Sequence, residues 1–322
     1  SSYFFIFELY KCNNNSVLPF NYFDISNLQN KEYKDYYFIE WKYIKKFNSY
    51  EDTDFFYCSF KNNKVWFNLN FESNKYYYFE FDNNIKEIEL SNCKELKLGH
   101  NIRHHLVSVI DENNFLWGEW ADYGPSSLWK GIYLLDRNEI AKDYRNLNDA
   151  NIILDNKDSI VQKGYETYYD TPIQYLEFNN LIFLYARYNP SPGAREVQVF
   201  VYKKYEDICK RTLFSKNIVS FDFSNKYSIY FIGGLAIFKN MIYSFVLVYP
   251  KDIVNDYHKY IRAEIFICKS NDGLNFTKII NLGYFKNNAM PLKMEISDIN
   301  INVYFLINFK NRMILSNKLF KI

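Results

Sequence analysis

The sequence predicts an all-β fold, a β-propeller of five four-stranded blades, with six blades as the alternative. Two observations lead to this prediction. Apolar and aromatic residues alternate with a period of two over short runs, whereas the 3.6-residue period of helices is nearly absent. Turns rich in asparagine recur along the chain. We expect residues 1–322 to form a single propeller domain, and a pair of stacked β-sandwiches is the competing architecture.

The recurring turns each place one or two asparagines between apolar runs, in segments 60–66, 110–116, 176–182, 237–243 and 299–304. Asparagine tolerates the positive φ angles that tight hairpins require, so each segment predicts a β-hairpin. The turn centres lie near residues 62, 113, 179, 240 and 301. They are spaced by about 50 to 65 residues, which suits one four-stranded blade with its loops.

Individual strands are clearest in the first of these units, where residues 54–61, 64–71 and 75–81 read as three successive strands. Two further candidate strands lie before them, at residues 1–10 and 36–47. We expect residues 3–10 to close the ring beside the last strands of the chain, after Asn302. The alternative is that the first 50 residues form a sixth blade.

Composition indicates a globular chain and excludes some partners. A hydrophobic content of 48% is enough to bury a core, and the net charge of +2 comes from 39 basic and 37 acidic residues that are interspersed. Nucleic acid is therefore not an expected partner. The longest uncharged stretch, Tyr227–Phe238, is shorter than the roughly 20 apolar residues of a membrane helix, so no membrane span is expected.

The five cysteines are odd in number and widely spaced, without any CxxC pair: Cys12, Cys58, Cys93, Cys209 and Cys268. This pattern argues against a disulfide framework and a structural zinc site, and it favours buried thiols in a reducing compartment such as the cytoplasm. The N-terminal residues show no basic leader, so targeting cannot be read from them. We expect no metal and no cofactor.

One turn carries a more specific signal. The stretch from Ser270 to Phe276, Ser-Asn-Asp-Gly-Leu-Asn-Phe, resembles the Asp-box of sialidase-like propellers, which lies on a hairpin between outer strands. The resemblance implies that Asp272 accepts backbone N–H groups, that Gly273 takes a positive φ, and that Phe276 fills the interface between blades. The motif is structural, and it supports the fold rather than an activity.

A second resemblance covers roughly residues 100–285. The stretch 169–211 resembles a middle blade of the five-bladed glycosidase superfamily of arabinanases, invertases and levansucrases, in which an acidic residue and a proline open an inner strand. Here Asp170 and Pro172 stand at that position, while the usual corner after the hairpin has diverged to residues 202–208. The resemblance implies activity on glycans or binding of them.

In a propeller the first strand of each blade lines the central channel, so the residues that start these strands converge on one mouth. Counting back from the turns gives Asp54, His104, Asp170 and residues 231–234. The glycosidase resemblance implies three carboxylates there, as base or nucleophile, general acid and pKa modulator. Asp54 and Asp170 match two of them, and Glu119 or Glu166 would supply the third. His104 departs from the pattern, because it stands where a carboxylate is expected.

Other side chains are candidates for contacting substrate. His104 and His105 point to opposite faces of a regular strand, so one is expected in the channel and a shared metal is not. Arg187 and Arg195 flank a hairpin loop and offer planar forks to a carboxylate or phosphate, with ion pairing to Glu196 or other acidic side chains as the alternative. The indole rings of Trp117 and Trp120 are candidates for stacking on sugars, with packing between blades as the alternative.

Two functions of different classes follow. The first is a carbohydrate-processing enzyme, a glycoside hydrolase or a relative, that uses carboxylates at the central funnel. The second is a non-catalytic propeller that binds a glycan or a protein as a module of a surface-polysaccharide system. Carboxylates that lie close enough together for catalysis would favour the enzyme over the binding module. Whether the chain is an enzyme stays open at this point. A purely structural scaffold would lack a concave polar mouth.

Overall fold

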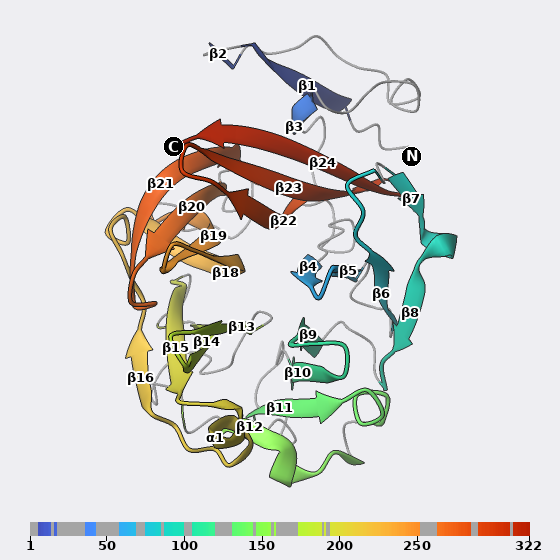
Figure 1. Ribbon diagram of the computed structural model, residues 1–322, viewed down its shortest axis with the longest axis vertical. Coiled ribbons are helices and arrows are strands. Elements are labelled where there is room, and N and C mark those ends of the chain that lie inside the picture. Colours follow the sequence, from blue (N-terminus) through green and yellow to red (C-terminus); the bar gives the residue numbers. More distant parts are fainter. Residues whose placement is uncertain are drawn as a thin grey trace.

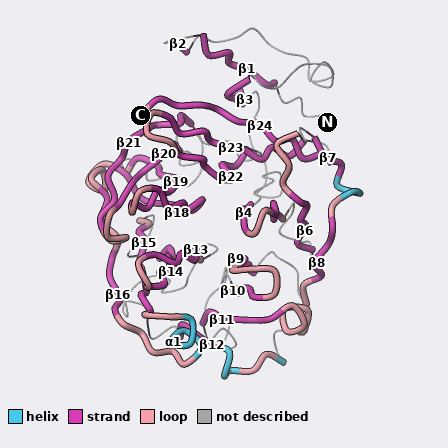
Figure 2. The backbone as a smooth tube through the Cα atoms, viewed as in Figure 1, coloured by secondary structure: helices cyan, strands magenta, loops and turns pink. Residues whose placement is uncertain are grey.

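The computed structural model describes residues 6–13, 16–17, 36–42, 58–68, 75–84, 87–99, 105–119, 131–143, 146–155, 158, 173–188, 190, 194–251, 263–284, 289–309 and 312–322. For residues 6–42, 105, 106, 119, 284, 289, 308, 309 and 312 within these ranges, the description concerns the backbone alone. Strands account for nearly all of the regular structure, and the few helical segments are short (Figure 2).

Five antiparallel sheets surround a central axis and form five blades (Figure 1). Blade 1 contains β4 (Cys58–Lys61), β5 (Lys64–Phe67), β6 (Lys75–Glu80) and β8 (Lys94–Lys97). Blade 2 contains β9 (His105–Val109), β10 (Asn114–Glu119), β11 (Gly131–Asp136) and β12 (Ile152–Asp155). Blade 3 contains β13 (Gln174–Phe178), β14 (Leu181–Tyr188), β15 (Glu196–Tyr202) and β16 (Ser215–Ile218).

The last two blades follow the same plan with additions at their outer edges. Blade 4 contains β18 (Tyr227–Phe238), β19 (Met241–Pro250), β20 (Glu264–Ser270) and β21 (Asn275–Tyr284), and β17 (Ser220–Phe221) pairs in parallel with β21. Blade 5 contains β22 (Ala289–Ile296), β23 (Asn300–Phe309), β24 (Arg312–Lys321) and β7 (Glu87–Glu89). The first strand of each blade lies next to the axis, which confirms the predicted five-bladed propeller over the sandwich alternative.

The asparagine turns connect the first two strands of blades 1 to 4, as the sequence predicts. Asn62 and Asn63 have φ angles of 50° and 57°, and Asn179 and Asn180 have φ angles of 51° and 59°. These are left-handed conformations that asparagine tolerates better than most residues. In blade 5 the turn consists of Ser297, Asp298 and Ile299, and β23 begins at Asn300. The asparagine turn predicted at residues 299–304 is therefore wrong, because its two asparagines lie in the strand.

The ring is closed by a different strand from the one predicted. After β6 the chain leaves blade 1, and β7 pairs with the outer edge of β24, with Ile88 opposite Met313. A short 3-10 helix, Leu90–Asn92, then returns the chain to β8 in blade 1. The prediction that residues 3–10 close the ring is wrong, because β7 already occupies the edge of β24.

The first strands of the chain form a sheet of their own. β1 (Ile6–Asn13) pairs with β2 (Ser16–Val17) and with β3 (Tyr36–Lys42), and Figure 1 shows this sheet outside the ring, beside β24. It is not a sixth blade around the axis. That residues 1–50 belong to the same domain as the propeller stays a prediction.

The Asp-box-like hairpin has the geometry expected of it. The Oδ1 atom of Asp272 accepts hydrogen bonds from the backbone N–H groups of Leu274 (2.7 Å) and Asn275 (2.8 Å), and Gly273 has a φ of 76°. The Phe276 ring is buried between blades 3 and 4, and its centroid lies 6.1 Å from that of Tyr185 in the neighbouring blade. The hairpin joins β20 to β21, so it lies on the outer part of the blade.

Candidate functional site

The two ends of the channel differ in the residues they carry. All five inner strands, β4, β9, β13, β18 and β22, begin at one end, which we call the strand-start mouth, and their hairpins lie at the other, the turn end. Because β14 and β19 run antiparallel to their inner neighbours, they finish at the strand-start mouth. Residues at the start of an inner strand and at the end of the next strand therefore meet there.

Several of the predicted site residues lie outside the described residues: Asp54, His104, Trp120, Glu166 and Asp170. In the sequence, Asp54 and Asp170 each stand four residues before an inner strand begins, since β4 starts at Cys58 and β13 at Gln174. The matching offsets agree with the expectation that both carboxylates belong to the strand-start mouth, which stays a prediction.

His105 and Glu119 are described by their backbone alone. His105 is the first residue of the inner strand β9, and Glu119 is the last residue of β10. The register of the two strands pairs Glu119 with His105 directly. Both residues therefore lie at the strand-start mouth, at the level where β9 begins.

Trp117 occupies a different environment. Its side chain is 4% exposed and belongs to the core between blades 1 and 2, where its ring packs edge-on against Tyr133. The ring centroids lie 5.4 Å apart. This is the blade-packing arrangement, so we do not include Trp117 among the residues of the mouth.

Arg187 and Tyr230 form the centre of the described part of the mouth. Arg187, near the end of β14, is 4% exposed, and its guanidinium carbon lies 4.3 Å from the centroid of the Tyr230 ring. Tyr230 is the extra residue of a β-bulge in β18, because the register with β19 shifts between Ile229 and Phe231. A bulge re-aims a side chain, and here it directs the ring towards the neighbouring blade.

Arg195 lies immediately before β15, on the other side of the loop that follows Arg187. Its backbone carbonyl accepts a hydrogen bond from the Ile229 N–H (3.0 Å), which ties blade 3 to the start of β18. Its Nη1 atom donates to the Ala194 carbonyl (2.9 Å). The Nε atom is buried and has no hydrogen-bond partner within the described ranges.

The Tyr249 hydroxyl is affected by the positive charges of both arginines. The side chain of Tyr249 is 3% exposed, and burial raises the pKa of its hydroxyl to about 12, against the opposing effect of the positive charges of Arg195 and Arg187. Ser228, at the start of β18, hydrogen-bonds to this hydroxyl and also lowers its pKa. The guanidinium groups of blade 3 therefore place positive charge near a buried tyrosine hydroxyl of blade 4.

The carboxylate nearest in sequence to Arg195 has another partner. The Oε2 atom of Glu196 accepts a hydrogen bond from the Tyr188 hydroxyl at 2.5 Å. The alternative expectation, an ion pair of Arg195 with Glu196, is not what the structure has, since Arg195 makes no ion pair with a carboxylate in the described part of the chain.

Sequence reasoning missed Tyr230, Tyr249 and Ser228. It placed residues 231–234 at the inner strand of blade 4 as a small apolar position, but it gave no sign that the neighbouring Tyr230 is re-aimed. The one available signal was the uncharged run Tyr227–Phe238, which is longer than an ordinary strand and so able to accommodate bulges.

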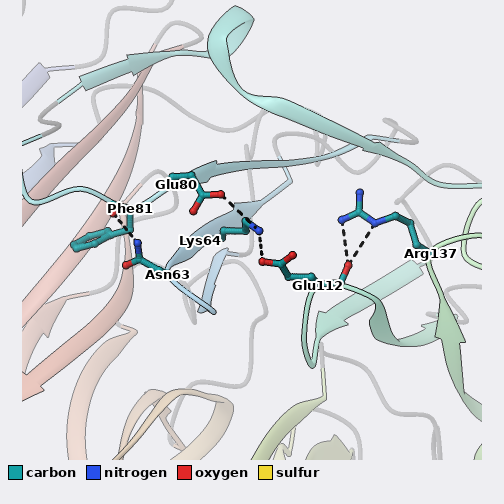
Figure 3. A network of polar contacts seen from close by, with 6 residues as sticks. All are labelled: Asn63, Lys64, Glu80, Phe81, Glu112 and Arg137. Carbon is teal, nitrogen blue, oxygen red and sulfur yellow. Dashed lines mark hydrogen bonds and ion pairs between the residues drawn. The ribbon is translucent and has the colours of Figure 1, made fainter.

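The turn end carries a separate hollow of about 490 Å³ between blades 3 and 4. Its lining includes Glu177, Lys204, Tyr205 and Ile237. Beside it, the Tyr175 hydroxyl donates a hydrogen bond to Glu177. Across blades 1 and 2 at this end, Lys64 forms ion pairs with Glu80 and Glu112 (Figure 3). Of these contacts, the Lys64–Glu112 ion pair joins neighbouring blades.

Within the described residues, no group of three or more His, Cys, Asp and Glu side chains is placed to hold a metal ion. Cys58, Cys93, Cys209 and Cys268 are free thiols, and burial raises the pKa of Cys58 and Cys268. None of the helices in this part of the chain has the length and apolar character needed to cross a membrane.

Comparison with known proteins gives similarities of fold at low identity. No family model matches the sequence, and no curated protein does. A thermostable family-43 glycoside hydrolase is similar with a TM-score of 0.44 at 10% identity, over 82% of this chain and 88% of the other. A family 117 glycoside hydrolase from Zobellia galactanivorans gives 0.39 at 12% identity, over 86% and 88%. The Bombyx mori GH32 β-fructofuranosidase gives 0.41 at 9% identity, over 82% and 58%. The assignment of five blades rests on the strand pairing of the chain itself.

Proposed function

We propose that this propeller binds a glycan at the strand-start mouth of its channel. The observation that carries the proposal is the contact in which Arg187 stacks on Tyr230, with Arg195 on the other side of the same loop and the positive charges of both arginines lowering the pKa of the Tyr249 hydroxyl. Polar side chains that converge between blades, next to a re-aimed aromatic ring, are typical of a ligand site at the end of a channel. The resemblance of the sequence to five-bladed glycosidases supports a carbohydrate as the ligand.

We further propose that the protein hydrolyses the glycan that it binds. Glycoside hydrolysis requires two carboxyl groups about 5 to 10 Å apart, one of which stays protonated to act as the acid. Asp54 and Asp170 are proposed for these roles, with Glu119 or Glu166 as the third carboxylate. Their positions before β4 and β13, and at the end of β10, support this choice.

The test combines binding and turnover. A glycan panel is screened for binding, and the glycans that bind are incubated with the protein while released reducing ends are measured. Asp170→Asn is expected to abolish the release and to keep the binding, because the amide cannot exchange the proton. Asp82→Asn, which changes an exposed carboxylate in the turn after β6, serves as the matched control and is expected to leave both unchanged.

A non-catalytic binding module is the second candidate. It is favoured by the described part of the mouth, which gathers arginines and tyrosines around Tyr249. Binding without any release of reducing ends, and with Asp170→Asn indistinguishable from the unchanged protein, would select this candidate. Absence of binding to every glycan in the panel would contradict glycan binding in both candidates and would leave a protein as the ligand of the second.

A further inference from the structure

Two cations lie at the strand-start mouth, on the two sides of the loop that joins β14 to β15. The Arg187 guanidinium carbon is 4.3 Å from the centroid of the Tyr230 ring, and the positive charges of Arg187 and Arg195 both lower the pKa of the buried Tyr249 hydroxyl. Like charges held close together and partly out of water repel each other, and an anion placed beside them lowers that cost.

The chain supplies no such anion to Arg195 within the described ranges. Glu196 accepts a hydrogen bond from Tyr188, and the Arg195 guanidinium donates a hydrogen bond to the carbonyl of Ala194. Its Nε atom is buried without an acceptor among the described residues. A buried donor left without a partner is costly, so a ligand that brings an acceptor is favoured there.

The geometry points to a glycan residue that carries a carboxylate, and we propose that Arg195 recognises this group. The inference rests on the proposed function above and names the class of sugar: a uronic acid or a similar acidic residue. A guanidinium offers two parallel N–H groups in one plane, and a carboxylate accepts both at once. Arg187 adds positive charge, and its stacking on Tyr230 fixes the plane of its own guanidinium.

The test uses uronic acid oligosaccharides paired with their methyl esters, which keep the rings and linkages and lose the charge. Binding of each pair is measured by calorimetry at low salt, with pairs built from galacturonate, glucuronate and mannuronate. In at least one pair the acid is expected to bind about tenfold or more tightly than the ester, because a hydrogen bond to a charged group is at stake.

Three variants locate the effect. Arg195→Gln is expected to weaken binding of the acid to the level of the ester and to leave the ester unchanged. Arg195→Lys keeps the charge but loses the planar fork, so its affinity for the acid should lie between that of the unchanged protein and that of Arg195→Gln. Arg137→Gln makes the same substitution at the turn end, where Arg137 contacts the Glu112 carbonyl (Figure 3), and should behave as the unchanged protein. Thermal unfolding of each variant shows whether it is folded.

Several outcomes would overturn the inference. Equal binding of acid and ester in every pair would do so, as would a preference for the acid that survives Arg195→Gln. Free sulfate that competes as well as free uronate would identify a general anion site instead of a carboxylate site. If the esters still bind in these cases, the proposed glycan binding stands. If no pair binds at all, the inference falls, and the wider panel described above decides the proposed function separately.

Discussion

The guanidinium carbon of Arg187 lies 4.3 Å from the centroid of the Tyr230 ring, and the two residues belong to adjacent blades. Arg187 comes from the end of β14, and Tyr230 comes from a bulge in the inner strand β18. The contact therefore joins blades 3 and 4 at the strand-start mouth and fixes the orientation of a buried cation there.

Replacing the aromatic ring of Tyr230 should weaken the contact between blades 3 and 4. Tyr230→Leu is expected to lower the free energy of unfolding by about 1 to 2 kcal/mol, because a desolvated cation–π contact is lost. Tyr230→Phe keeps the ring and should cost less. Urea denaturation of both variants measures the difference. Equal losses for the two variants would mean that the ring face contributes nothing to stability.

The Asp-box-like turn should be important for stability alone. Asp272→Ala removes the acceptor of the Leu274 and Asn275 N–H groups, so it should lower the free energy of unfolding by about 1 to 2 kcal/mol. Glycan binding should stay unchanged, because the hairpin lies on the outer part of blade 4. Loss of binding in a variant of normal stability would contradict the structural role.

The same aspartate gives a pH dependence with a defined direction. Burial opposes ionisation of Asp272, but hydrogen bonds from Asn275, Leu274 and Ser270 outweigh it and lower its pKa to about 2, from an ordinary value of 3.8. An aspartate whose pKa is lower in the folded protein than in the unfolded chain stabilises the fold at pH values above the unfolded-state pKa. This stabilisation is lost as the pH falls towards and through the folded-state pKa. Stability of the unchanged protein should therefore fall more steeply between about pH 4 and pH 2 than that of Asp272→Ala. Parallel acid-unfolding profiles would argue against this assignment.

Both the backbone conformation at position 273 and the lack of room for a Cβ atom favour glycine there. The φ angle of Gly273 is 76°, and an added Cβ atom would lie 2.7 Å from a ring carbon of Phe183 and 2.9 Å from the Tyr185 hydroxyl. Gly273→Ala should therefore destabilise the protein by more than the roughly 1 kcal/mol that a left-handed alanine costs. Chemical denaturation decides the point, and a loss within a few tenths of a kcal/mol would show that the neighbouring rings adjust freely.

The seam between blades 5 and 1 contains an aromatic cage. The Lys293 ammonium lies 3.9 Å from the Phe81 ring centroid, 4.6 Å from that of Phe60 and 4.7 Å from that of Tyr304. A double-mutant cycle of Lys293→Met and Phe81→Leu should give a coupling energy of about 0.5 to 2 kcal/mol. The cycle of Lys318→Met and Phe320→Leu, a pair within β24, is the comparison and should couple less. A coupling energy near zero in the first cycle would show that the contact between Lys293 and Phe81 does not stabilise the seam between blades 5 and 1.

The sequence predicts the blades because their signal is local. An asparagine turn such as Asn179-Asn180 needs only its own residues to adopt a positive φ, and the alternation on either side gives the two strands. The Asp-box-like stretch is equally local, so the roles of Asp272 and Gly273 follow from seven residues.

What the sequence does not predict depends on distant pairing. β7 is only three residues long, and its partner β24 lies more than two hundred residues away in the chain, so no local pattern identifies it as the closing strand. The bulge at Tyr230 breaks the period-two alternation that the prediction assumes. The cluster around Tyr249 needs both the bulge and the contact between blades.

Hydrogen exchange measures whether a bound glycan occupies the strand-start mouth. Amide exchange is measured with and without the glycan that binds most tightly in the panel. Slower exchange is expected at the end of β14, at the start of β15 and at the start of β18, around Arg187, Arg195 and Tyr230. Slower exchange confined to the turn end, around Glu177 and Tyr205, would contradict binding at the strand-start mouth and place the ligand in the hollow there.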